Sequence, residues 1–144
     1  MFTIENYGAA SLQRQLDMAV LHNQGRKIGA IHFGGIAIEC LLKNMIVQYH
    51  ALSSWDSHSK QTGQPITNPK HILFYAVRSI STLQLRVTSN PEVRQLIKDV
   101  QQPFGDHYIE WRYVGTEPNT EKYDEWYQSY NKLRKWLIEQ SKNL

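Results

Sequence analysis

The chain has 144 residues, of which 41% are hydrophobic and 11% aromatic, and its formal net charge is +3. This length predicts a single domain over residues 1–144, large enough to bury a core without metals or disulfides. The hydrophobic content excludes an intrinsically disordered chain. The small positive charge permits contact with phosphate groups, but no basic cluster is dense enough to form a nucleic-acid-binding tail.

Cys40 is the one cysteine in the sequence, so no disulfide can form within the chain. We expect it to be a small core residue. No spacing of cysteines and histidines resembles a zinc site, and we expect neither a metal nor a cofactor. The N-terminal sequence MFTIENYGAA lacks the basic and apolar segments of a signal peptide, which predicts a cytoplasmic protein.

Residues 9–24 predict the first helix, because apolar side chains recur there at helical spacing. Gly25 follows at the position where many helices end in a left-handed residue. The short connection leads into a second helix over residues 26–50, which we expect to run antiparallel to the first. The stripe of the first helix consists of Leu12, Leu16, Ala19, Val20 and Asn23.

The segment 26–50 is apolar on most sides, which is typical of a central helix with neighbours packed around it. Charged residues interrupt the segment, so we do not expect it to span a membrane, which requires about 18 uncharged apolar residues. Gly34 and Gly35 each destabilise a helix by about 1 kcal/mol relative to alanine. We expect them to permit the close approach of a bulky side chain or a second backbone; the alternative is a contact with a ligand or another subunit.

Asparagine residues at three positions predict the starts of the later helices. Asn68 and Asn90 each precede a proline, a combination that favours a helix N-terminus, and Asn119 is a suitable cap for the last helix. The expected helices after the first two cover residues 68–86, 92–101 and 120–142.

Two segments lack a helical period. Residues 51–67 predict a loop, in which Trp55 anchors the chain to the bundle, and residues 103–118 predict an irregular segment rich in aromatic side chains. The predicted fold class is therefore all-α: an up-and-down bundle of four to five helices with one irregular aromatic segment before the last helix.

Three motifs occur in an order that resembles the HEPN family, the higher eukaryotes and prokaryotes nucleotide-binding domain. Residues 37–43 (AIECLLK) resemble the pattern of the family's second helix. Residues 70–73 (KHIL) lie where standalone members often have a glycine-histidine-acid-leucine helix start. Residues 111–113 (WRY) resemble an element found ahead of the last long helix. The resemblance extends over nearly the whole chain.

The resemblance implies a helical bundle, often dimeric, that associates with nucleotides or RNA. Many members are ribonucleases, often toxins, and many small members pair with a minimal nucleotidyltransferase. The ribonucleases carry an R-x(4–6)-H motif near the start of the last core helix, whereas no histidine follows His107 in this sequence, so Arg112 lacks that partner. Arg26 and His32 have a comparable spacing, but they lie at the start of the second helix, and we interpret the match as coincidence.

Glu39 and Lys43 lie one helical turn apart among apolar residues, where each charge requires a partner. The pair either stabilises the bundle or lines a polar cleft in which Lys43 contacts a phosphate. Arg112 either pairs with Glu39 and fixes the aromatic segment, or binds a phosphate beside the stacking faces of Trp111 and Tyr113.

His71 lies at an expected helix start, and it is either a capping or core residue or a ligand-binding one. If the protein is an enzyme, His107 is the candidate proton carrier and Arg112 its partner. We expect His22, His50 and His58 to be surface residues.

The leading functional prediction is a nucleotide- or RNA-associated binding protein that forms a homodimer and belongs to a toxin–antitoxin or nucleotidyltransferase pair. The alternatives are a metal-independent ribonuclease with a nonstandard active site and a structural protein–protein interaction module. The missing histidine favours a protein without enzymatic activity. The expected ligand-binding residues are Arg112, Tyr113, Trp111, Lys43, Glu39 and His71.

Overall fold

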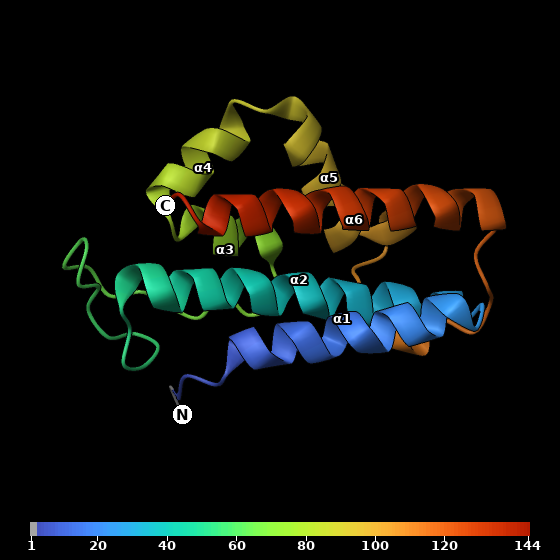
Figure 1. The fold of residues 1–144 in the computed structure, drawn as a ribbon, viewed down its shortest axis with the longest axis horizontal. Helices are drawn as coiled ribbons and strands as arrows, with labels where there is room; N and C mark the ends of the chain where they lie inside the picture. The colour runs from blue at the N-terminus through green and yellow to red at the C-terminus, as the bar shows by residue number, and fades with distance from the viewer. Residues whose placement is uncertain (1–2) are drawn as a thin grey trace.

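The computed structural model describes residues 3–144, and over this range it contains helices and loops but no β-strand (Figure 1). The predicted all-α class is confirmed. The helical elements are α1 (Tyr7–Asn23), α2 (Lys27–His50), α3 (Leu73–Arg78), α4 (Ser81–Thr88), α5 (Pro91–Gln101), the short 3₁₀ turns η1 (Pro103–Gly105) and η2 (Glu110–Tyr113), and α6 (Thr120–Ser141).

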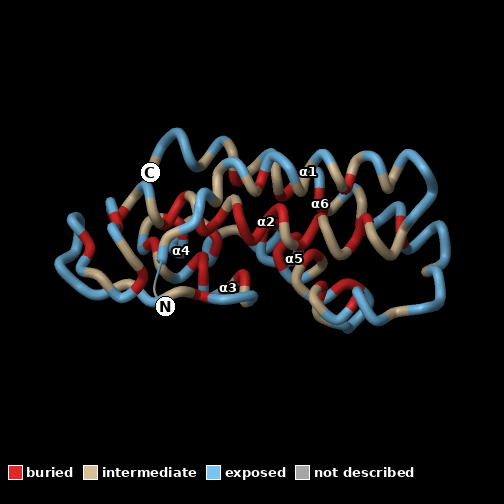
Figure 2. The backbone as a smooth tube through the Cα atoms, turned by 90° about the horizontal axis from the view of Figure 1, so that it is seen from below, coloured by how far each residue is buried: buried red, intermediate tan, exposed pale blue. Residues whose placement is uncertain are grey.

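The core lies along α2, which α1, α6 and the shorter helices surround (Figure 2). Ala30, Ile31 and Ile38 are completely buried there. Within residues 3–144, α2 is the one helix long and apolar enough to cross a membrane by length and composition, and 67% of its apolar window is buried inside the fold. The prediction that this segment is the central helix is confirmed.

The two glycines of α2 provide room for aromatic side chains from later in the chain. A Cβ atom at Gly35 would overlap the ring of Tyr108, and one at Gly34 would lie 2.7 Å from Cη2 of Trp126. Real Cβ atoms do not approach neighbours so closely, so both positions require glycine. The expected close approach of bulky side chains is confirmed.

The first helix buries a different face from the one that its apolar stripe suggests. Ser11 and Met18 are its buried residues, and the Ser11 hydroxyl donates a hydrogen bond to the carbonyl of Ala37 on α2 (3.0 Å). Gln15 also faces inward, where it accepts a hydrogen bond from the hydroxyl of Tyr130 on α6. The apolar stripe consequently faces solvent, with Leu12, Leu16 and Val20 between 57% and 61% exposed.

The predicted helix over residues 68–86 is wrong in its start and its continuity. The side chain of Asn68 accepts from the backbone N–H of Lys70 and so forms a turn, in which Lys70 has a φ of 56°. The helix therefore begins at Leu73 rather than after the proline. The predicted helix is also interrupted at Ile80, which separates α3 from α4. Ile80 is fully buried and has an extended conformation (φ −123°, ψ 106°).

The loop over residues 51–67 is fixed to the bundle at two points. Trp55 is 3% exposed and donates from Nε1 to the hydroxyl of Tyr7 (3.0 Å), as predicted. His50 is buried between the hydroxyl of Ser59 (2.6 Å) and the carbonyl of Ser79 (2.6 Å). The expectation that His50 is a surface residue is wrong, because its ring connects the loop to α3.

Candidate functional site

Glu39 is the centre of a buried polar cluster on α2. The residue is 7% exposed, and its carboxylate accepts from Lys43 Nζ (2.9 Å to Oε2), from His71 Nδ1 (2.7 Å to Oε1) and from the hydroxyl of Tyr108. Lys43 is 5% exposed, and its ammonium also lies 5.6 Å from the centre of the Tyr7 ring. The predicted Glu39–Lys43 pair is therefore present, and His71 joins it.

The cluster contains the donors that a buried carboxylate requires. Burial, together with the negative charge of Glu39, raises the pKa of Tyr108, which keeps its hydroxyl protonated and able to donate. Burial and the same negative charge raise the pKa of the neighbouring Cys40 thiol to about 11. Cys40 is therefore a protonated core residue near neutral pH, as expected, and not a thiolate nucleophile.

His71 is positioned at the surface by the turn that precedes α3. Its side chain is 57% exposed although its Nδ1 is bound to Glu39. Its Nε2 has no hydrogen-bond partner within residues 3–144. A carboxylate on one ring nitrogen fixes the tautomer and leaves the other nitrogen free to accept a proton, provided that His71 is neutral.

His107 lies next to the backbone of His71, and both of its ring nitrogens form hydrogen bonds. Its Nε2 donates to the carbonyl of His71 (2.7 Å), and its Nδ1 accepts from the backbone N–H of Ile109 (3.1 Å). These bonds assign the neutral tautomer and leave no free nitrogen for proton transfer. His107 connects the aromatic segment to the His71 turn, and this geometry argues against the predicted role of a proton carrier.

Arg112 does not pair with Glu39, so that alternative is wrong. The hydroxyl of Tyr108 occupies the position next to Glu39 instead. Arg112 belongs to the 3₁₀ turn η2 and is exposed, and its guanidinium lies 4.8 Å from the centre of the Tyr113 ring. Tyr113 is 76% exposed, whereas Trp111 is buried and donates from Nε1 to the carbonyl of Pro103 (3.2 Å). Of Trp111 and Tyr113, Tyr113 is therefore the one whose aromatic ring is exposed.

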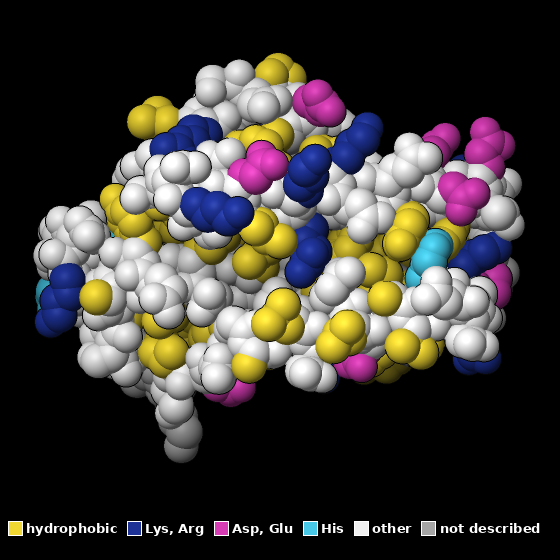
Figure 3. All heavy atoms as spheres, viewed as in Figure 1, with side chains coloured by type: hydrophobic (Ala, Val, Ile, Leu, Met, Phe, Trp, Pro, Cys, Tyr) yellow, Lys and Arg dark blue, Asp and Glu magenta, His cyan; other side chains and the backbone are white. Residues whose placement is uncertain are grey.

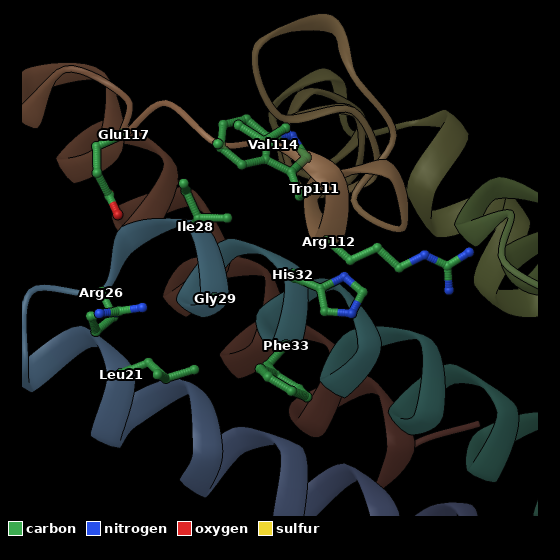
Figure 4. A pocket seen from close by; sticks show the side chains of 11 residues that line it. Leu21, Arg26, Ile28, Gly29, His32, Phe33, Trp111, Arg112, Val114 and Glu117 are labelled. Carbon is green, nitrogen blue, oxygen red and sulfur yellow. The ribbon is translucent and has the colours of Figure 1, made fainter.

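A groove of about 550 Å³ lies between the start of α2 and the segment after η2 (Figure 4). Three basic or titratable side chains and one acidic side chain line it together with apolar residues. In the view of Figure 4, His32 lies between Arg26 and Arg112. The side chains that line the groove include Arg26, His32, Arg112, Glu117, Leu21, Ile28 and Phe33.

The N-terminus of α2 opens into this groove. No side chain caps the helix at Arg26, and Ile28 and Gly29 of its first turn line the groove. The backbone N–H groups of a first turn have no partner within the helix and favour an anion. His32 then links the groove to the Glu39 cluster, because its Nδ1 lies 2.9 Å from the carbonyl oxygen of Tyr108.

The structure thus divides the predicted site residues between two places. Glu39, Lys43 and His71 meet in the cluster, and Arg112 lies at the groove. The sequence prediction missed Tyr108, for which the adjacent glycines of α2 were the only signal. It also set aside Arg26 and His32, although both of them line the groove.

The chain has no recognisable relative in three comparisons: no protein-family model, curated protein or solved structure matches it. Within residues 3–144, no group of three or more histidine, cysteine, aspartate or glutamate side chains is arranged to hold a metal ion.

Proposed function

We propose that this chain is a HEPN-like protein that binds nucleotides or RNA through the groove at the N-terminus of α2. The observation that supports the proposal is that Arg26, His32 and Arg112 all line one groove with apolar walls, whose acidic lining residue is Glu117. Arginine suits phosphate because its planar fork donates two parallel hydrogen bonds. A cavity of this size, with apolar walls and few polar groups, is typical of small-molecule sites.

The surroundings of the groove suggest how a ligand lies in it. A phosphate near Arg26 would also meet the uncapped first turn of α2, which carries partial positive charge. The exposed ring of Tyr113, next to Arg112, is available to stack on a base outside the groove, and such stacking contributes about 1–3 kcal/mol per base. We therefore expect short single-stranded RNA to bind more tightly than a mononucleotide.

Fluorescence anisotropy with labelled single-stranded RNA, with mononucleotides as competitors, tests the proposal. Arg112→Ala removes a charge-assisted contact and should weaken binding about tenfold or more. Arg78→Ala is a matched control, because Arg78 is also exposed and lies 4.4 Å from the centre of the neighbouring Tyr75 ring. Absence of binding by the unmodified protein, or equal weakening in both variants, would refute the proposal.

A second candidate function, metal-independent RNA cleavage, is favoured by the free Nε2 of His71. In this reaction Nε2 takes the proton of a ribose 2′-hydroxyl, and the 2′-oxygen attacks the adjacent phosphorus. The bond to the 5′-oxygen breaks, and that oxygen takes a proton from solvent, which leaves a 2′,3′-cyclic phosphate. Glu39 holds the ring through Nδ1. This assignment replaces the predicted His107 with His71.

RNA incubated with the protein in the presence of EDTA tests the second candidate. Products with cyclic phosphate ends should form with the unmodified protein and with His107→Gln, and should disappear with His71→Ala. Cleavage that persists in His71→Ala, or that never occurs, excludes His71 as a general base. The latter result leaves the binding proposal intact, because the two assays use different readouts.

The resemblance also underlies a proposal about partners. We infer a cytoplasmic protein that associates with a minimal nucleotidyltransferase or an antitoxin. Coexpression with the product of an adjacent reading frame, followed by size-exclusion chromatography, measures whether a complex forms. A tight protein complex without any RNA or nucleotide binding would favour the third alternative, an interaction module.

A further inference from the structure

The solvent face of α1 is apolar where helices of soluble proteins normally carry charge. Leu12, Leu16 and Val20 recur at four-residue steps, so each lies about 40° further around the helix than the last, and all three are more than half exposed. In Figure 3 hydrophobic side chains follow one another along the surface of α1. Such a stripe is the pattern of a helix that packs against another helix.

The composition of this face differs from that of the other long surface helix. None of the most exposed residues of α1 is charged, although the side chains of Arg14 and Asp17 are 39% and 44% exposed, whereas α6 exposes seven charged side chains. Arg14 and Asp17 form an ion pair within α1 (2.9 Å), so their two charges cancel. The exposed residues of α1 are Ala9, Leu12, Gln13, Leu16, Val20 and Asn23, and the exposed charged residues of α6 are Glu121, Lys122, Asp124, Glu125, Lys132, Lys135 and Glu139.

We propose that this face of α1 is the contact surface between two copies of the chain, packed antiparallel about a twofold axis at Leu16. The positions are symmetric about that residue: Leu12 meets Val20 of the other copy, and Ala9 meets Asn23. A twofold contact requires a patch that matches itself in this way. The face carries no net charge, so two copies with a net charge of +3 meet where neither presents that charge.

A second copy fits this face better than a charged partner does. A basic or acidic partner would meet the charges of Arg14 and Asp17 along α1 only as a pair that is already formed within the helix. The face is also small, because a helix of 17 residues is about 25 Å long, and a standard interface buries about 800 Å² on each partner. The dimer is therefore weak, and it forms in a concentration-dependent way.

Cysteine cross-linking tests the register directly. A cysteine at position 16 would face its own copy across the axis, within the separation that a disulfide tolerates. Under copper-phenanthroline and dissolved oxygen, which accept the electrons of the two thiols, Leu16→Cys should cross-link at least about fivefold faster than Leu85→Cys. Leu85 is the matched control because it is 71% exposed on α4, and the natural Cys40 is buried and contributes little background. A mixture of Leu12→Cys and Val20→Cys should cross-link more than either variant alone.

Sedimentation equilibrium gives an independent measurement without oxidation. The unmodified protein should associate between about 10 and 500 µM, a range suited to a small interface, and Leu16→Glu should remain monomeric with an unchanged melting temperature when dilute. A monomeric unmodified protein overturns the proposal, as does cross-linking of Leu16→Cys no faster than that of Leu85→Cys. Association that survives Leu16→Glu places the interface elsewhere and also overturns it.

Discussion

Replacing Gly35 with alanine inserts one methyl group where the ring of Tyr108 lies against α2. Overpacking of this kind costs about 1–3 kcal/mol. The displaced tyrosine also loses its hydrogen bond to the Glu39 carboxylate, which contributes about 1.5–3 kcal/mol. Alanine recovers about 1 kcal/mol through its higher helix propensity. We expect a net loss of about 3 kcal/mol and a melting temperature lower by about 6–12 °C.

Thermal unfolding followed by circular dichroism measures this loss, and Gly29→Ala is its control. Gly29 lies in the same helix, but its added Cβ would meet only the end of the flexible Leu21 side chain, at 2.9 Å. Gly29→Ala should therefore be neutral or stabilising by up to about 1 kcal/mol. In a Tyr108→Gly background, which removes both the ring and the Tyr108 Cβ that would lie 2.6 Å away, Gly35→Ala should stabilise as well. If Gly35→Ala is as stable as the unmodified protein, Tyr108 does not pack as described.

Three further predictions concern the polar cluster. Glu39→Gln leaves Lys43 buried without a counter-charge and should destabilise the protein by about 3–5 kcal/mol in urea unfolding, whereas Glu39→Gln with Lys43→Met should recover part of that loss. The raised pKa of Tyr108 means that this side chain ionises first in the unfolded chain, so its contribution to stability should be constant below pH 10.0, its ordinary value, and fall above it, and Tyr108→Phe should make that decline shallower. Cys40, whose pKa is raised to about 11, should react with a thiol reagent at pH 8 only after unfolding, and rapid reaction of the folded protein would contradict its burial.

The sequence predicts the helices best where a local signal is strong. Asn90 and Asn119 cap α5 and α6 as expected, with their side chains accepting from the N–H groups of Val93 and Lys122. Gly25 has the positive φ of 71° that the connection between α1 and α2 requires. These features depend on a few neighbouring residues, so a single sequence contains them.

Sequence reasoning fails where distant residues decide the outcome. The Asn68 signal resembles that of Asn90, yet it produces a turn, and the following His71 is held by Glu39 of α2. The apolar stripe of α1 has helical spacing, but spacing alone does not distinguish residues that face the core from residues that lie on the protein surface. Which side of α1 is buried depends on Ser11 and Gln15, whose partners lie on α2 and α6.

The candidate site was predicted only in part for the same reason. The Glu39–Lys43 pair lies within one turn of a helix and was found. Tyr108 was missed because its contact with Glu39 spans 69 positions of the chain. Arg112 was assigned the place that Tyr108 occupies, since both belong to the same aromatic segment and only the fold determines which of them faces α2.

The connection between α2 and α3 offers a position for labelling or insertion. Buried hydrogen bonds of Trp55 and His50 hold its base, so a change further out does not loosen the bundle. Its tip at Gly63 is exposed and has open space around it, although the φ of 74° favours glycine at this position itself. Exposed tips with small polar residues tolerate inserted sequence. A fluorophore or affinity peptide placed between Thr62 and Gln64 should therefore report on the protein while leaving both the groove and the α1 face free.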